Sequence, residues 1–417
     1  MVNLNIASQE KLKTLFSLLF VNLAYATIYF SPGIEHGGQV PLFFLFLLSV
    51  PLIFSKKCYQ DIDIKFLFAL VFVFIAAIPL AIKSGEGEAL DAPSRFLIVS
   101  IVFIALYRMP INGTWILRSA IAACLLASTV SIHEITTTNT NRVNLGIGIL
   151  ESAYTLSILI FMCVAALFNE KNLFWKALAV SAIVAGSITL LQTGTRGAWL
   201  ACVVGGVLFL ELKTGKLLCK KFAFGVLIFS VASFITYNFS DSVNIRVSNT
   251  VKEFQKLGDF NRKTSSNLRL IYWEHAWEGF KLNPITGLSY QENASLRKEF
   301  AKRYNVHMTG TQDGRSSSHN EILNAMVQKG VIGLLAILLV YLIPLKHFLN
   351  KLKSTQTSVK NYALAGISTI SVMFISGLTE APLMHTSVSV TYGMMLVLLY
   401  HAIRNEELKH KETSCSP

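Results

Sequence analysis

The sequence is poor in charge: Asp, Glu, Lys and Arg make up 15% of its 417 residues, while 53% are hydrophobic. An ordinary soluble domain carries about 25% charged residues, so this composition excludes that class. Apolar runs of about 15 to 22 residues recur along the chain, long enough to cross a hydrocarbon core about 30 Å thick. We therefore expect a membrane protein. Its spans should be helices, because the runs are continuous and do not alternate as in a β-barrel.

Cysteine is scarce as well, and its placement excludes two kinds of site. The six cysteines are Cys58, Cys124, Cys163, Cys202, Cys219 and Cys415. None lies in the polar segment 238–319, so neither a disulfide framework nor a thiolate metal site is expected there. A cleavable signal peptide is not evident either. The first apolar run ends at Ser31-Pro-Gly33 without a convincing small-residue cleavage site, so we expect this run to be retained.

The apolar runs predict about twelve membrane spans, some of them short enough to tilt or to embed only in part. They lie at residues 13–30, 40–54, 66–82, 96–107, 115–133, 146–168, 173–191, 198–211, 222–237, 329–346, 361–378 and 386–403. The fold class expected is an all-α polytopic membrane protein. Its parts are a nine-span bundle (1–237), a large, partly helical loop (238–319), a helix entering the last three spans (320–403) and a tail (404–417).

The formal net charge of +13 gives no sign of a nucleic-acid partner, because the Lys and Arg residues are distributed in a way that indicates membrane topology. One set of alternate connections, together with both termini, contains twenty Lys and Arg residues, and the opposite short loops contain four. The positive-inside rule then places both termini in the cytoplasm and the 238–319 loop outside. Long loops are exempt from this rule, which explains how the loop can carry twelve basic residues and still be translocated.

Within the loop, the stretch from Ser265 to Phe280 has the period of a helix. One apolar stripe recurs at spacings of three and four, and Asn283-Pro284 would end the helix. The residues of the stripe are Leu270, Trp273, Trp277 and Phe280.

The rest of the loop is expected to be irregular as far as Gly314, because it shows no clear period. Ser318-His-Asn-Glu321 then has the form of a capping box, with Ser318 as N-cap and Glu321 reaching back to it. His319 would be the first residue of a helix that continues into the tenth span.

Three polar side chains are expected to meet at the outer face. Arg196 starts a helix after a very short loop, Arg269 lies in the first turns of the loop helix, and His319 starts another helix. Helix N-termini offer free N–H groups and partial positive charge, so two arginines beside them suit an anion such as a diphosphate. The same dipole disfavours an imidazolium, leaving a neutral ring that can accept a proton near pH 7.

Each of these residues has a plainer interpretation. An outer-loop arginine commonly anchors lipid headgroups, and His319 could start a helix without any catalytic role. Glu151 lies inside the sixth span, where a carboxylate is a functional candidate by default. The other polar residues near the outer boundary are expected to have solvated loop roles; they are His133, Glu134, Arg142, Glu380 and His385.

Four motifs, in this order, resemble those of the bacterial O-antigen ligases. They are Asn141-Arg-Val-Asn-Leu-Gly-Ile-Gly148, Gln192-Thr-Gly-Thr-Arg196, Asn267-Leu-Arg269 followed by Tyr272-Trp-Glu274, and the stretch from His319 to Leu334. These ligases are polytopic inner-membrane proteins with one large periplasmic loop before the last spans. The motifs cover residues 141–334, and the topology extends the resemblance over most of the chain.

The resemblance implies a metal-independent, inverting glycosyltransferase of the GT-C type that needs no cofactor. Such an enzyme transfers O-antigen glycan from undecaprenyl diphosphate to a sugar hydroxyl of lipid A–core. Its partners would be this lipid-linked donor, the lipid A–core acceptor and membrane lipids. The sequence offers no obvious Asp-x-Asp pair for Mg²⁺, and two guanidinium groups can stabilise the charge that develops on a leaving diphosphate.

The matched motifs also imply roles for single residues. Arg196 and Arg269 would bind the donor diphosphate and His319 would be the base on the acceptor hydroxyl. The supporting candidates are Arg142, Glu321 and Tyr272. Some members have a second histidine where this chain has Ser317, which favours His319 acting singly.

Two alternatives remain open. An O-antigen polymerase or a protein O-oligosaccharyltransferase of the same superfamily would share the donor and the large loop, so the acceptor decides between them. A twelve-span transporter belongs to a different class. It is disfavoured because the halves show no repeat relation and lack paired, interrupted spans.

Overall fold

The computed structural model describes residues 18–19, 21–22, 25, 39–53, 62–109, 111–138, 142–214, 248 and 264–414. Within this part of the chain the regular elements are helices, with no strand, which confirms the all-α class. The expected span 222–237 lies outside the described residues, as does the start of the large loop apart from Ser248. The expected span 13–30 is described at five positions only.

The described residues form nine apolar helical segments long enough to cross a membrane. Each expected span in this part of the chain coincides with a helix, which confirms a polytopic membrane protein, while the count of twelve stays a prediction. The segments are α3 with α4 (Ile64–Ile75, Ile78–Ser84), η1 with α5 (Gly87–Leu90, Asp91–Leu106), α6 (Gly113–Thr138), α7 (Ile149–Asn169), α8 (Leu173–Gln192), α9 (Arg196–Thr214), α14 (Glu321–Lys351), α15 (Thr357–Gly377) and α16 (Thr386–Ser414), accompanied by the shorter α2 (Gln39–Ile53).

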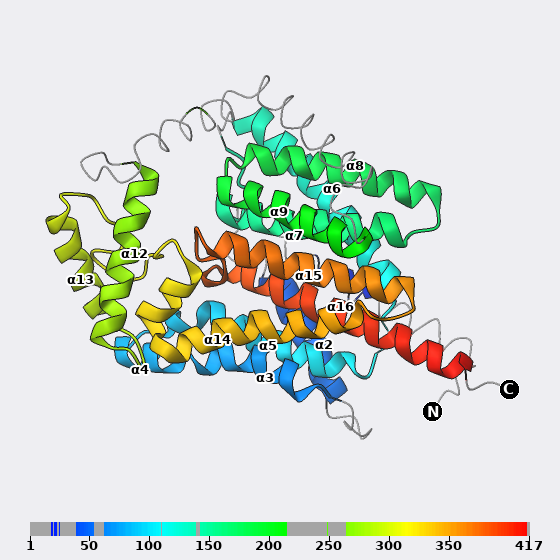
Figure 1. Cartoon of the computed structure of the whole chain (residues 1–417), viewed down its shortest axis with the longest axis horizontal. Coiled ribbons are helices and arrows are strands. Elements are labelled where there is room, and N and C mark those ends of the chain that lie inside the picture. Colours follow the sequence, from blue (N-terminus) through cyan, green and yellow to red (C-terminus); the bar gives the residue numbers. More distant parts are fainter. Residues whose placement is uncertain are drawn as a thin grey trace.

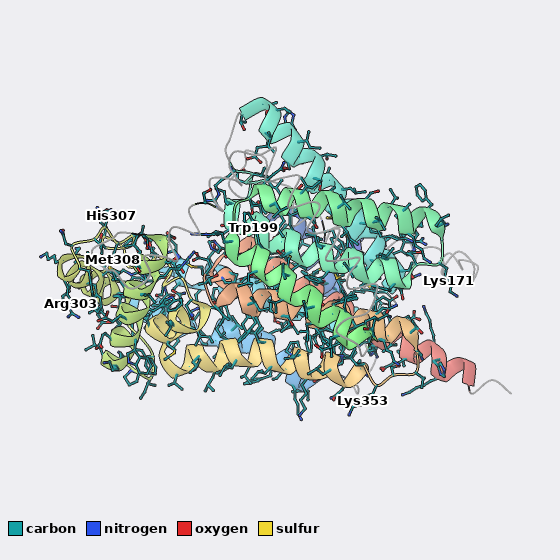
Figure 2. The ribbon with its side chains drawn as sticks, turned by 45° about the horizontal axis from the view of Figure 1, so that its top comes forward. Lys171, Trp199, Arg303, His307, Met308 and Lys353 are labelled. Carbon is teal, nitrogen blue, oxygen red and sulfur yellow. The ribbon has the colours of Figure 1, made fainter. Side chains whose placement is uncertain are left out.

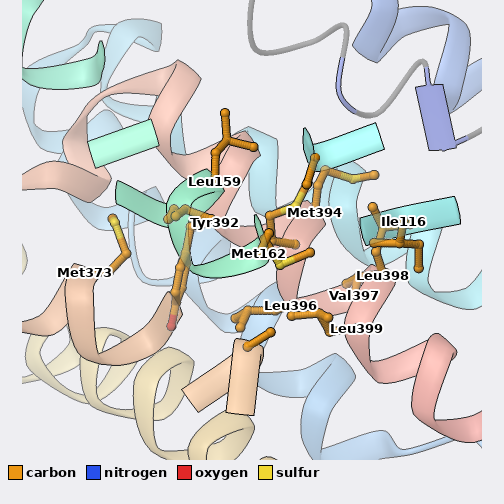
Figure 3. Packing of buried hydrophobic residues seen from close by; sticks show 14 of the residues in the cluster. Ile116, Leu159, Met162, Met373, Tyr392, Met394, Leu396, Val397, Leu398 and Leu399 are labelled. Carbon is orange, nitrogen blue, oxygen red and sulfur yellow. The ribbon is translucent and has the colours of Figure 1, made fainter. Parts of the chain in front are cut away.

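Helices α15 and α16 lie at the centre of the bundle. In Figure 1, α6 to α9 lie on one side of them, and α2, α3, α5 and α14 lie on the other. Helix α15 packs on α7, α9 and α14, and α16 packs on α5, α6 and α7. The side chains of α16 from Tyr392 to Leu399 gather with Met373 of α15 and with Leu159 and Met162 of α7 (Figure 3). The core of the bundle therefore forms around the C-terminal helices.

The loop helix predicted from Ser265 is confirmed as α12 (Ser265–Leu282), with Thr264 as N-cap and Asn283 as C-cap. Its predicted apolar stripe is wrong, since Trp277 is 48% exposed. The buried face lies on nearly the opposite side of the helix, counting about 100° per residue, because α12 packs against α13 and α14 from that side. This face consists of Asn267, Ile271, Tyr272, His275, Ala276 and Gly279.

The stretch expected to be irregular contains a second loop helix, α13 (Tyr290–Arg303). A capping box starts it: the Ser289 N–H donates to Glu292 Oε2 at 2.7 Å, and the Glu292 N–H donates to Ser289 Oγ at 3.2 Å. Because α13 is largely polar, its hydrophobic period is weak. The Ser-x-x-Glu spacing at Ser289 was the sequence signal that could have identified it.

Helix α14 contains a break at Gly330 (φ 61°, ψ −152°). The connection after α12 inserts there: the Val331 N–H donates to the Pro284 carbonyl and the Leu288 N–H to the Val327 carbonyl, both at 2.8 Å. A Cβ on Gly330 would lie 2.3 Å from the Ile285 carbonyl group, so only glycine fits. The loop helices are thereby attached where α14 enters the bundle.

The loop helices α12 and α13 lie at one end of the bundle (Figure 1). Figure 2 shows Lys171 and Lys353, from two basic connections, at the opposite end from Arg303 and His307. This arrangement agrees with the segregation of charge in the sequence, because connections assigned to the cytoplasmic side share one end of the bundle.

Ion pairs and a hydrogen bond also join the loop to the bundle. Arg315 is ion-paired with Glu86, at 2.6 Å, and with Glu88. Lys83 donates to the Gly287 carbonyl at 2.8 Å. The end of α4 and the η1 turn therefore hold the segment that leads to His319.

Candidate active site at the junction of loop and bundle

His319 lies just before α14 and not in its first turn. The N-cap is Asn320, whose side chain accepts the Leu323 N–H at 3.1 Å. The predicted capping box is therefore wrong. The Ser318 N–H instead donates to Asn324 Oδ1 at 3.1 Å, and the Glu321 carboxylate accepts the Leu383 N–H at 2.8 Å. Since His319 lies outside α14, it is not the helix-start residue expected from the sequence.

The backbone of His319 adopts the left-handed conformation, with φ 51°. This is uncommon for a residue other than glycine and persists only where the surroundings enforce it. The His319 N–H donates to Ser317 Oγ at 2.9 Å, and its carbonyl accepts Trp273 Nε1–H at 3.1 Å. Its ring contacts the Tyr272 ring edge to face, at a centroid distance of 5.0 Å. Helix α12 therefore fixes the position of this histidine.

The ring of His319 is paired with a buried carboxylate. Its Nδ1 lies 2.9 and 2.8 Å from the two carboxylate oxygens of Glu380. Glu380 lies between α15 and η2 (Pro382–Met384) and is 5% exposed, so the solvated loop role expected for it is wrong. Burial alone would raise the pKa of the Glu380 carboxyl, but the hydrogen bond and charge of His319, with the charge of Arg269, hold it below its ordinary value.

This pairing determines what each ring nitrogen of His319 can do. An ionised carboxylate can only accept hydrogen bonds, so Nδ1 donates to Glu380. In the neutral ring, Nε2 then carries the lone pair. Nε2 is the atom that could take a proton from a hydroxyl group, and the carboxylate would stabilise the imidazolium that results.

The two arginines singled out in the sequence lie on different elements that reach this region. Arg269 lies one turn before Trp273 on α12, and its charge acts on Glu380. Arg196 is the first residue of α9, as expected. The residue after it, Gly197, packs on Thr379, whose Oγ1 would lie 2.5 Å from a Cβ at this position. Since Thr379 precedes Glu380, the start of α9 lies beside the His319 pair.

Arg142 supports the same region from the first motif. Its Nε donates to the Thr193 carbonyl at 2.7 Å, in the turn between α8 and α9. The Val143 N–H donates to the Gln192 carbonyl at 3.2 Å. The first motif therefore packs directly on the second, and Arg142 acts on the turn that presents Arg196.

A second imidazole–carboxylate pair lies in the same region. His385 Nδ1 is 2.8 Å from Glu151 Oε1. The solvated role expected for His385 is therefore wrong. Gly148, at φ 111°, leaves room for the Glu151 carboxylate, since a Cβ there would lie 2.2 Å from Glu151 Oε2. The positive φ favours glycine at the end of the first motif, and the glycine leaves the Glu151 carboxylate in its place beside His385.

Comparison with known proteins finds a family match that covers part of this site. Residues 181–338 match the family model described as O-antigen ligase. The match supports the O-antigen ligase and polymerase superfamily. The resemblance seen in the sequence is thereby confirmed at this level, over a region that contains Arg196, Arg269 and His319. A Haemophilus influenzae protein described as uncharacterized is 26% identical over 399 residues, which are 92% of this chain and 97% of that protein.

Within the matched region, Arg297 has a role that the sequence did not reveal. Its side chain is fully buried, and it donates from Nη1 to the Thr309 carbonyl at 2.8 Å and from Nη2 to the Ser316 carbonyl at 2.6 Å. Its guanidinium also lies over the Tyr272 ring, 5.3 Å from the centroid. Arg297 therefore holds the irregular segment that ends at His319.

The supporting candidates Tyr272 and Glu321 both hold parts of the site. The Tyr272 hydroxyl accepts the Thr309 N–H at 2.7 Å. Glu321 fixes η2 through Leu383, and η2 joins Glu380 to His385. No signal in the sequence pointed to the two imidazole–carboxylate pairs, since the members of each pair lie far apart in the sequence. Among the described residues, no group of three or more His, Cys, Asp or Glu side chains is arranged to hold a metal ion.

Proposed function

We propose that the protein is an O-antigen ligase, which transfers O-antigen glycan from undecaprenyl diphosphate to a sugar hydroxyl of lipid A–core. The observation that carries this proposal is the His319–Glu380 pair, set beside Arg269 where the loop helices meet the bundle. A lipid-linked donor needs a site at such a junction, because its polyprenyl chain stays in the bilayer while its glycan meets an acceptor in water.

In the proposed reaction, Nε2 of His319 takes the proton of the acceptor hydroxyl. The hydroxyl oxygen attacks the anomeric carbon of the donor sugar, and the bond from that carbon to the diphosphate oxygen breaks, with inversion. A positioned general base contributes about 10²- to 10⁴-fold to such a step. Arg196 and Arg269 stabilise the charge that develops on the leaving diphosphate, so no metal ion is required.

The topology proposed with this function has both termini in the cytoplasm and the site at the periplasmic face of the inner membrane. The distribution of Lys and Arg supports this orientation. The opposite placement of Lys171 and Lys353 relative to the loop helices supports it as well (Figure 2).

A transfer assay with purified protein, undecaprenyl-diphosphate-linked glycan and lipid A–core tests the function. We expect His319→Ala to lose about 10²- to 10⁴-fold in rate. The matched control is His307→Gln, at an exposed imidazole on the loop (Figure 2). Full transfer by H319A made at normal levels would show that His319 is not the base.

The identity of the acceptor distinguishes a ligase from a polymerase or an oligosaccharyltransferase of the same superfamily. In a strain lacking the protein, unligated lipid-linked polymer indicates a ligase, whereas lipopolysaccharide capped by a single repeat indicates a polymerase. Glycan transferred to protein hydroxyls would indicate an oligosaccharyltransferase. Substrate flux in proteoliposomes without any acceptor would indicate a transporter.

A further inference from the structure

Two imidazole–carboxylate pairs belong to one charge cluster. Glu380 holds His319 and Glu151 holds His385, each through Nδ1 of the ring at 2.8 Å in the shortest contact. The charge of Glu380 also acts on both Glu151 and His385. The η2 turn joins the two pairs, and Glu321 holds this turn through the Leu383 N–H.

The cluster raises a problem of charge for a site that binds a diphosphate. Two carboxylates, Glu380 and Glu151, lie where an anion is to be bound. The charge of Arg269 acts on Glu380, so this carboxylate offsets part of the positive charge of the site. The Glu321 carboxylate, which holds η2, also acts on this region. A nearby cation that offsets this negative charge would favour the binding of an anion.

His385 has the geometry to be that cation. Its side chain is 25% exposed, and Nδ1 is used by Glu151. The hydrogen bonds that the described residues make leave Nε2 unused, so it can serve a ligand. Burial would lower the pKa of His385, but the hydrogen bond and charge of Glu151 raise it above the ordinary value. A protonated ring donates from both nitrogens and has no lone pair with which to act as a base.

We propose that His385, paired with Glu151, is a third donor-binding residue whose Nε2–H donates to a phosphate oxygen of the lipid-linked diphosphate. This inference rests on the proposed function, from which it takes the diphosphate as ligand. The two histidines then differ in role. His319 removes a proton from the acceptor, and His385 binds the leaving group.

The test measures binding of undecaprenyl diphosphate to the full-length protein in lipid nanodiscs, together with transfer kinetics and thermal unfolding. The variants are His385→Gln, Glu151→Gln and the double variant, with His307→Gln as the control. H385Q should weaken binding by about tenfold or more, the size expected for a lost charge-assisted hydrogen bond. KM for the acceptor should stay unchanged.

The double variant shows whether the affinity lost in H385Q is due to the unpaired charge of Glu151 or to the changed shape of the side chain. H385Q leaves Glu151 as an uncompensated carboxylate, so adding E151Q should recover much of the lost affinity. Unchanged binding by H385Q together with a lower melting temperature would overturn the inference and make the pair a structural tie for η2. A rise in the acceptor KM alone would overturn it too. If the wild-type protein neither binds the probe nor transfers glycan, the proposed function itself fails.

Discussion

Replacing Glu380 by Gln tests whether a carboxylate is what makes His319 an effective base. The glutamine side chain has nearly the same shape and can still accept the Nδ1–H of the ring through its amide oxygen. It removes the negative charge that stabilises the imidazolium formed during the reaction. Because Glu380 is 5% exposed, solvent screens this charge only weakly.

The size of the effect follows from the contact between His319 and Glu380. A hydrogen bond to a charged group contributes about 1.5 to 3 kcal/mol, and about 1.4 kcal/mol corresponds to a factor of ten. Glu380→Gln should therefore lower kcat by about 10- to 100-fold. His319→Ala should cost more, and the double variant should be no slower than H319A, because both residues act through one ring.

The assay is glycan transfer by purified variants at saturating donor and acceptor. Glu299→Gln is the matched control, since it neutralises an exposed carboxylate on α13 that lies outside the site. A wild-type kcat for E380Q would refute the role of the pair. So would a double variant whose loss equals the product of the two single losses, because independent effects cannot arise from one proton acceptor.

Three further predictions concern residues that shape the site. Arg297→Lys should lower both kcat and the melting temperature, because an ammonium group cannot reproduce the planar fork that reaches the Thr309 and Ser316 carbonyls; an unchanged melting temperature would contradict this. Gly148→Ala should reduce binding of undecaprenyl diphosphate, because its Cβ would displace Glu151, and wild-type binding would count against that contact. Burial, then the charge of Arg297, lowers the pKa of His275 to about 3, whereas an unfolded histidine titrates near pH 6.5. The stability that the neutral His275 ring contributes is therefore fully present above about pH 6.5 and is lost as the pH falls towards 3. At pH 5 this loss lowers the free energy of unfolding by about 2 kcal/mol. Unfolding of His275→Gln between pH 5 and 7.5 should lack this slope.

Features that depend on local pattern could be predicted from the sequence. Long apolar runs predicted the spans because a segment in lipid must satisfy its own backbone. The period and stop signals after Ser265 predicted α12, and the short loop before Arg196 placed it at a helix start. The order of the motifs then indicated the superfamily. All of these signals lie within a few residues of the feature they describe.

Which side chains meet depends on how the helices pack. Glu380 lies 61 residues from His319 and outside the matched motifs, so no local pattern could pair them. The same holds for Glu151 and His385, which also lie far apart in the sequence. The left-handed backbone of His319 also depends on contacts from Trp273 and Ser317. Pairing, burial and strained backbone are properties of the packed surroundings, and for this reason only the folded chain shows how the site is built.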